Sequence, residues 1–242
     1  MSALAQTTWR AEPGLAGGSC LRVAGAELLA DASGALYYPA AQVLVVADLH
    51  FEKGSAFAGR GVFLPPYDSA ATLQRLAAVL DKYAPRYLVA LGDSFHDVRA
   101  AERMQASDHE RLKSLQGQCE WIWIAGNHDP VPPQGLGGAA RAAWQSGPLV
   151  FRHEPQAGPS PGEIAGHLHP VAKVAARGTS MRRRCFVSDG TRCILPAFGA
   201  YAGGLNICDP AFGGLFQTSR AVHVLGRERV FAVSPRSCSP DH

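Results

Sequence analysis

Short apolar runs recur along the chain and predict β-strands. The clearest cover residues 43–47, 87–91, 121–125, 148–151 and 163–165. Runs of this length, bounded by glycine, proline or charged residues, are typical of buried strands. The stretch 21–42 indicates further short strands, with turns at Ala24-Gly25 and Ser33-Gly34.

Helical spacing separates several of these runs. After a Pro-Pro turn, apolar residues recur at Leu73, Leu76, Leu80 and Tyr83. They predict an amphipathic helix with Asp68 as its N-cap. The segment 98–118 predicts a second, highly charged helix, and we expect a short third helix from Arg141 to Gln145.

The second half of the chain is rich in strands. Six strand-like segments lie within residues 171–234, one of them at 205–209. Strands alternate with helices in the first half of the chain, and strands predominate in the second half. This order favours an α/β fold in which helices flank a sandwich of sheets. The length of 242 residues suits one large domain. We expect a disordered N-terminal segment at 1–18, a single domain at 19–233 and a disordered tail at 234–242.

Composition narrows the class of protein. Hydrophobic residues make up 47% and charged residues 18%, and the net charge of +3 does not by itself imply nucleic acid or a membrane surface. The six cysteines form no C-x-x-C pair, the first residues do not resemble a secretory signal, and no apolar run approaches the ~18 residues that span a bilayer. We therefore expect a cytoplasmic protein with reduced thiols and no membrane association.

The five clearest apolar runs all end in side chains that bind metals. These candidate ligands are Asp48, His50, Asp93, Asn127, His153, His167 and His169. If the first strand continues far enough, Asp48 and His50 point to the same face, since side chains at i and i+2 do so. Ligand sites in α/β sheets lie at the carboxyl ends of strands. Seven donors exceed the four of a structural zinc and suit two divalent ions, with Asp93 as the bridging carboxylate.

Each signal alone has an ordinary structural explanation. A single histidine at a strand end is usually a hydrogen-bonded core residue, and Gly-Asn-His-Asp alone is compatible with a turn. The coincidence of five such endings favours a metal centre instead. Glycines stand directly before Asp93, Asn127 and His167. They would permit sharp turns and a close approach of the backbone.

The order D-x-H, G-D, G-N-H-D, H, G-H-x-H over residues 48–169 resembles the signature of the calcineurin-like metallophosphoesterases. The resemblance implies an αββα sandwich with a dinuclear metal centre. By position, Asp48, His50, Asp93 and His169 resemble the ligands of one ion, and Asp93, Asn127, His153 and His167 those of the other. His128 resembles the catalytic histidine.

Further stretches, among them VVADLHFEKG, LPPYDSAATL and LPAFGAYAGGL, are similar to the PdeM-type phosphoesterases. The resemblance to this group, which comprises DNA-damage-response endonucleases, implies a bacterial cytosolic protein that acts on DNA in repair. It also implies an ATP-dependent DNA ligase and a helicase as partners. The resemblance also implies Mn²⁺, although the mixed oxygen and nitrogen donors accept Fe or Zn.

Phosphate ester hydrolysis needs more acceleration than one acid or base supplies. We expect a metal-bridging hydroxide to attack phosphorus while His128 assists the leaving oxygen. Asp129 either orients His128 or caps a helix. His96, just past Asp93, either contacts the phosphate or lies in a surface loop.

A basic stretch follows the ligands. It contains Lys173, Arg177, Arg182, Arg183, Arg184 and Arg192, with only Asp189 opposing. It suits a nucleic-acid backbone, with Arg182, Arg183 and Arg184 as substrate contacts, or else forms a solvated positive edge. Three functions stay open: a phosphodiesterase acting on DNA, a phosphatase or phosphodiesterase for small nucleotides, and a non-catalytic metal-binding scaffold.

Overall fold

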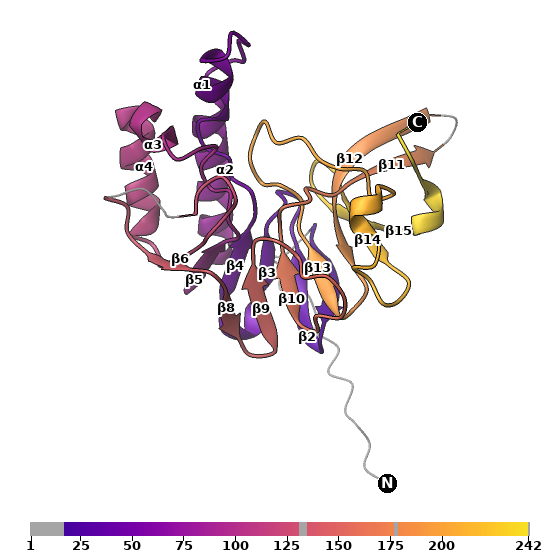
Figure 1. Ribbon diagram of the computed structural model, residues 1–242. Coiled ribbons are helices and arrows are strands. Elements are labelled where there is room, and N and C mark those ends of the chain that lie inside the picture. Colours follow the sequence, from indigo (N-terminus) through magenta and orange to yellow (C-terminus); the bar gives the residue numbers. More distant parts are fainter. Residues whose placement is uncertain (1–16, 131–134, 177–178, 242) are drawn as a thin grey trace.

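Two β-sheets lie face to face in the computed structural model, which describes residues 17–130, 135–176 and 179–241 (Figure 1). The first sheet contains, in spatial order, β1 (Ser19–Val23), β2 (Ala26–Ala30), β3 (Leu36–Tyr38), β4 (Val43–Val46), β5 (Tyr87–Ala90), β6 (Glu120–Ile124) and β7 (Ala139–Arg141). Its strands from β4 to β7 are parallel, so their carboxyl ends share one edge.

The second sheet runs in the order β15 (Val230–Val233), β14 (Ala221–Leu225), β12 (Thr179–Ser188), β13 (Arg192–Ile194), β10 (Glu163–Ala165), β9 (Leu149–Arg152) and β8 (Trp144–Ser146). The central strands β9, β10 and β13 are parallel. A further strand, β11 (Val171–Ala176), pairs with β12, and β16 (Cys238–Ser239) pairs with β11.

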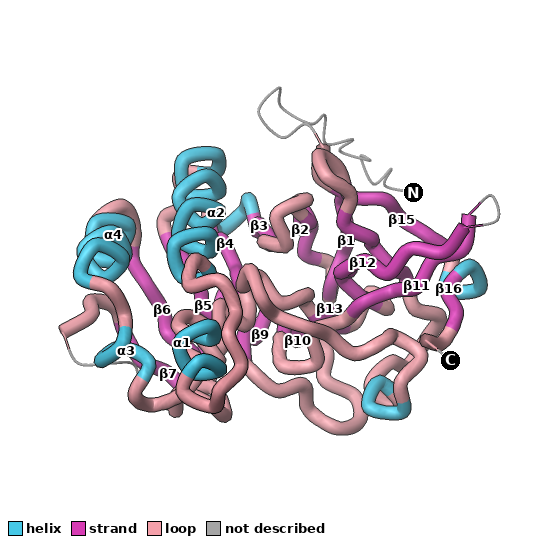
Figure 2. The backbone as a smooth tube through the Cα atoms, turned by 90° about the horizontal axis from the view of Figure 1, so that it is seen from above, coloured by secondary structure: helices cyan, strands magenta, loops and turns pink. Residues whose placement is uncertain are grey.

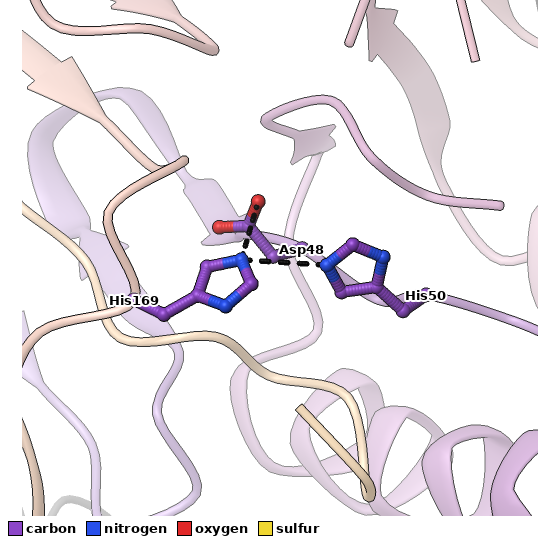
Figure 3. A group of neighbouring side chains, drawn as sticks. All are labelled: Asp48, His50 and His169. Carbon is purple, nitrogen blue, oxygen red and sulfur yellow. Dashed lines mark hydrogen bonds and ion pairs between the residues drawn. The ribbon is translucent and has the colours of Figure 1, made fainter. Parts of the chain in front are cut away.

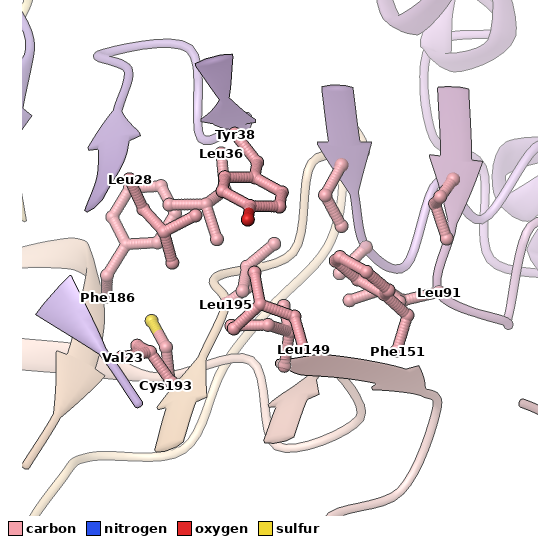
Figure 4. Close-up of a cluster of buried hydrophobic side chains, with 14 of the residues drawn as sticks. Val23, Leu28, Leu36, Tyr38, Leu91, Leu149, Phe151, Phe186, Cys193 and Leu195 are labelled. Atoms are coloured by element: carbon pink, nitrogen blue, oxygen red, sulfur yellow. The ribbon is translucent and has the colours of Figure 1, made fainter. Parts of the chain in front are cut away.

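Two hydrophobic clusters hold these layers together. Between the sheets, apolar side chains from β2, β3 and β4 meet Leu149, Phe151, Phe186 and Leu195 from the second sheet (Figure 4). On the outer face of the first sheet, α2 (Asp68–Tyr83) and α4 (Ala106–Gln116) cover β4, β5 and β6 (Figure 2). The α-helices α1 (Lys53–Ala58) and α3 (Ala100–Arg103) are shorter. The α/β sandwich of sheets flanked by helices is confirmed.

The described residues also contain three short 3₁₀ helices, namely η2 (Pro39–Ala41), η3 (Pro210–Phe212) and η4 (Pro235–Ser237). Across the described ranges, no helix combines the length and apolar character that crossing a bilayer requires.

The prediction of a helix from Arg141 to Gln145 is wrong. The segment is divided between β7 and β8. Trp144 packs its ring against Tyr87 and Phe151, with centroids 5.3 and 5.5 Å away, so tertiary packing overrides the local pattern.

Asp68 is not the N-cap of α2. Tyr67 occupies that position, and the Asp68 carboxylate instead accepts a hydrogen bond from the Gly54 amide at 2.9 Å. Asp68 therefore joins the start of α2 to α1.

The C-terminal residues expected to be disordered form η4 and β16 within the described chain. Asn206, from the segment 205–209 that was expected to be a strand, makes only an isolated bridge to Val171 and donates its side-chain amide to the Ser239 carbonyl at 3.0 Å. The expectation for the N-terminus falls mainly on residues 1–16, which lie outside the described residues.

Candidate metal centre

The loops after β4, β5 and β10 carry ligands in left-handed backbone conformations. Asp48 and His50 have φ angles of 54° and 46°, and Asp93, His167 and His169 have 45°, 68° and 47°. Strand geometry ends at Val46, so alternation along a strand is not what brings Asp48 and His50 together. Each left-handed residue other than glycine costs about 1–3 kcal/mol, which the surrounding structure must offset.

Hydrogen bonds between the ligand loops supply that support. The His50 amide donates to the Asp93 carbonyl at 2.9 Å, and the His167 amide donates to Asp48 Oδ2 at 3.1 Å. The loops from the two sheets are therefore bonded to each other as well as to their own strands.

The first group of ligands contains Asp48, His50 and His169 (Figure 3). His169 Nε2 lies 3.1 Å from Asp48 Oδ1 and 3.3 Å from His50 Nε2. One donor atom from each residue lies within 4.8 Å of the others, which is the spacing of ligands around one ion.

The second group contains Asp93, His153 and His167 and has the same spacing. The Nδ1–H of His153 donates to the Leu91 carbonyl at 2.8 Å, which leaves Nε2 to face Asp93 at 3.4 Å and His167 at 3.2 Å. A carbonyl that fixes the tautomer of a histidine in this way is common behind metal sites.

Three glycines allow these groups to form, as predicted for the glycines before Asp93, Asn127 and His167. A Cβ on Gly92 would lie 2.7 Å from the His153 ring. On Gly126 it would lie 2.4 Å from Asp93 Oδ1, and on Gly166 2.6 Å from Asp48 Oδ2. Any side chain at these positions would displace a ligand.

The electrostatics of the centre favour a cation. Asp48 is fully buried and Asp93 is 4% exposed. Burial lowers the pKa of His153, but the hydrogen bond to Asp93 and the charges of Asp48 and Asp93 outweigh it and raise the pKa to about 9. Buried carboxylates require a compensating positive charge. The donor set of carboxylate oxygens and imidazole nitrogens therefore fits divalent cations.

The pKa values of His50 and Asp93 also reflect the opposing effects of burial and of neighbouring groups. Burial lowers the pKa of His50 to about 3, so its imidazole is neutral and able to bind a cation. Burial also acts to raise the pKa of Asp93, but hydrogen bonds from His153 and the His128 amide hold it below its usual range. Asp93 is consequently a carboxylate at neutral pH.

The loop after β6 carries Asn127 and His128, which are both exposed. Within the described residues no hydrogen bond joins Asn127 to either ligand group, whereas His128 lies at the rim of the centre. The His128 amide donates to Asp93 Oδ1 at 2.9 Å, and His128 Nε2 lies 3.9 Å from Asp93 Oδ2. The ring of His128 stacks on His96, with centroids 5.4 Å apart. His96 thus sits beside the centre, and burial together with Lys53 and His128 lowers its pKa.

Asp129 does not contact His128 among the described hydrogen bonds. Its Oδ2 accepts from the amides of Ser94 and Phe95 at 2.8 and 3.0 Å. Burial raises the pKa of Asp129 to about 7. Asp129 thus ties the loop after β6 to the loop after β5.

The three consecutive arginines of β12 make different contacts. Arg182 donates to the Gly204 carbonyl at 2.6 Å, and Arg184 donates to the Ala197 carbonyl at 2.8 Å. Arg183 is exposed, and within the described part of the chain its one hydrogen bond goes to the Met181 sulfur at 3.8 Å.

Two other members of the basic stretch do not extend an exposed edge. Arg192 is fully buried and lies 3.3 Å from Glu163, and the Lys173 ammonium donates to the Asp241 carbonyl. Arg177 lies outside the described residues.

Sequence reasoning assigned no role to the loop that backs the first group. The Phe198 amide donates to the Ala47 carbonyl at 2.7 Å and the Gly199 amide to the Asp48 carbonyl at 3.1 Å. Arg75 of α2 donates to the Phe198 carbonyl at 2.5 Å. The only sequence signal for this loop was the stretch LPAFGAYAGGL.

The sequence model of the calcineurin-like phosphoesterases matches residues 41–181, more than half of the chain. No curated protein matches the sequence.

The solved structures to which the chain is similar include a nuclease and a phosphoesterase. The nuclease MPE of Pseudomonas putida has a TM-score of 0.69 and 29% sequence identity, over 89% of this chain and 100% of that chain. Yfce, a phosphoesterase from E. coli, has a TM-score of 0.39 and 16% identity, over 79% of this chain and 98% of that chain. Every predicted metal ligand lies within the range that the family model matches. The chain therefore belongs to the calcineurin-like phosphoesterase family and is a metal-dependent phosphoesterase.

Proposed function

We propose that this protein is a dinuclear-metal phosphodiesterase that cleaves nucleic acid. The observation that carries the proposal is the pair of adjoining Asp/His groups, with His128 and His96 side by side at their open rim. The similarity to a nuclease of Pseudomonas putida supports nucleic acid as the substrate class.

Each side chain takes a distinct part in this proposal. Asp48, His50 and His169 hold one cation, Asn127, His153 and His167 hold the other, and Asp93 contributes to both. When bound, two divalent cations activate water and neutralise charge on the phosphoryl oxygens. The residues of the chain then have to orient the substrate and deliver a proton.

His128 is the proton donor in this scheme. Its side chain is 48% exposed and lies beside Asp93, so it reaches a leaving oxygen without being enclosed among the ligands. His96 stacks on the same ring and contacts the phosphate. Asp129 acts as a positioning residue, because its carboxylate holds the Asn127–His128 loop against the loop that follows Asp93.

The finer assignments rest on the PdeM-type resemblance and belong to the same proposal. We assign Mn²⁺ as the native ion, with Fe and Zn as the other metals that the donor set accepts. We assign the activity to DNA repair, together with an ATP-dependent DNA ligase and a helicase. The six cysteines are all free thiols, which supports the reducing cytoplasm as the location.

The test is an activity panel on protein stripped of metal and reloaded with Mn²⁺, Zn²⁺, Fe²⁺ or Mg²⁺. The substrates are a simple phosphodiester, a phosphomonoester, and linear and circular DNA. We expect Mn²⁺ to restore cleavage of the diester and of DNA over the monoester. Hydrolysis confined to monoesters or mononucleotides would establish the small-nucleotide alternative, and protein that binds metal but hydrolyses nothing would establish the scaffold.

A further inference from the structure

A cavity lined by arginines lies beside β12, separate from the metal ligands. Its volume is about 560 Å³. Four of the residues that line it are Arg182, Arg183, Arg184 and Arg227. No aspartate or glutamate is among its described lining residues. Arg227 comes from the turn between β14 and β15, so two separate hairpins contribute positive charge.

Most of this charge has no counter-charge in the described chain. Arg182 pairs with Asp241 at 3.3 Å. Within the described ranges, no ion pair involves Arg183, Arg184 or Arg227, and Glu228, next to Arg227 in the turn, is also unpaired. Arg183 and Arg227 are both exposed. Their guanidinium groups are therefore available to a ligand.

Arg184 adds a partly buried charge to this wall of the cavity. Its partners are the carbonyls of Ala197 and Phe198, and the guanidinium of Arg75 donates to the same Phe198 carbonyl. Two positive charges therefore lie close together at this carbonyl, and burial together with the neighbouring Arg75 lowers the pKa of Arg184 to about 10. An anion in the cavity would offset them.

The guanidinium groups and the size of the cavity favour phosphate as its ligand. Planar guanidinium groups match phosphate oxygens with paired hydrogen bonds. Among the described lining residues none is aromatic, so this part of the chain offers no ring on which a base would stack. A volume of about 560 Å³ falls within the range of small-ligand sites.

One loop connects the cavity to the metal centre. Arg184 holds the Ala197 carbonyl, and the next residues, Phe198 and Gly199, donate to Ala47 and Asp48 behind the first ligand group. We propose that the arginine cavity binds a backbone phosphate of the nucleic acid strand, away from the phosphate that is cleaved. This inference rests on the proposed nuclease function and deepens it.

The test uses the exposed arginines and leaves Arg184, which supports the loop, in place. Binding of a fluorescein-labelled single-stranded oligonucleotide to the full chain is followed by anisotropy in EDTA at increasing salt. Because the cavity holds one phosphate, we expect the double variant Arg183→Ala/Arg227→Ala to bind more weakly and to flatten the slope of log K against log [salt] by ~0.7. Each phosphate contact on a single strand contributes ~0.7 to that slope.

Two matched variants make the result specific. Arg141→Ala/Arg236→Ala removes the same charge from exposed positions outside the cavity and should leave the slope close to that of the wild type. Arg183→Lys/Arg227→Lys retains the charge and should keep most of the slope. An unchanged slope in the first variant, or an equal loss in the Arg141/Arg236 variant, would overturn the proposal.

Failure of this inference is distinguishable from failure of the proposed function, because binding is measured without turnover. If the protein cleaves DNA but the Arg183→Ala/Arg227→Ala variant leaves the salt slope unchanged, only the phosphate-binding role of the cavity is refuted. If that variant flattens the slope but the wild-type protein does not cleave DNA, only the proposed hydrolysis is refuted.

Discussion

Single residues at the metal centre adopt a backbone conformation that few side chains tolerate. Asp48, His50, Asp93, His167 and His169 are all left-handed. This conformation turns each ligand back over the end of its strand, while hydrogen bonds such as His50 to Asp93 offset the strain. Strain of this kind gathers at functional sites because ligand geometry, and not stability, determines it.

The role of His128 predicts a variant that separates binding from turnover. His128→Ala should keep its full metal content, because no ligand is removed, but lose a factor of roughly 10² to 10⁴ in kcat. Elemental analysis and diester hydrolysis check the two parts. His109→Ala on α4 is the control and should match the wild type. Full turnover by His128→Ala would exclude the residue from catalysis.

The contact between Gly166 and Asp48 predicts a steric loss of metal. In Gly166→Ala the new Cβ would lie 2.6 Å from Asp48 Oδ2, so the carboxylate must move. We expect Mn²⁺ affinity to fall at least about tenfold, as when a group that orients a ligand is lost. Gly203→Ala is the matched control, because its Cβ would meet nothing within 4 Å. Calorimetric titration measures both variants, and equal affinities would refute the steric argument.

At the scale of elements, the sequence predicted the strands at the five clearest apolar runs and the amphipathic helix well, since burial leaves a strong apolar or periodic pattern. Prediction from the sequence failed where contacts between distant segments determine the local secondary structure. The helix expected at 141–145 became strands because Trp144 packs on Tyr87 and Phe151. The tail joined β11 through pairing that no local pattern contains.

A buried carboxylate fixes α2 to the turn after β2. Asp31 accepts hydrogen bonds from Lys82 at 2.7 Å, from Tyr83 at 2.6 Å and from the Ser33 amide at 2.8 Å. Burial acts to raise the pKa of Asp31, but these bonds outweigh it and lower the pKa. The ionised form therefore stabilises the fold at pH values above the unfolded pKa. That contribution disappears as the pH falls through the folded pKa.

Asp31→Asn should consequently lower the free energy of unfolding by about 1–3 kcal/mol at neutral pH. The difference from the wild type should shrink as acid protonates Asp31 in the wild type. Urea denaturation at neutral and acidic pH measures it. Asp81→Asn, which alters an exposed carboxylate on α2, should cost little at either pH. A pH-independent difference for Asp31→Asn would contradict the linkage.

Across the whole molecule, each ligand group draws on both sheets. Asp48, His50 and Asp93 follow strands of the first sheet, whereas His153, His167 and His169 follow strands of the second. The residue types at the ends of the apolar runs suggest these six as ligands, and the structure brings them together in two groups. The left-handed turns and the supporting loop at 197–199 were not predictable, because they depend on backbone contacts between distant segments.

Bound metal should therefore stabilise the folded protein as a link between the sheets. At a Mn²⁺ concentration 100 times its Kd, one site contributes about 2.7 kcal/mol, which for a chain of this size raises Tm by roughly 5–10 °C. Thermal unfolding with Mn²⁺ and with EDTA measures the shift. Asp48→Asn should lose a large part of it, while Glu110→Gln on α4 should keep it. The same Tm with Mn²⁺ and with EDTA would show that the two ligand groups do not bind this ion.

Because neither ligand group lies within one half of the chain, synthesis on the ribosome has a defined order of events. Asp48, His50 and Asp93 emerge first, and the second group cannot assemble until His153 and His167 have left the exit tunnel. The first group must wait two residues longer, for His169. A nascent chain is thus unable to capture its cations, or to attack nucleic acid near the ribosome, before its second sheet has begun to form.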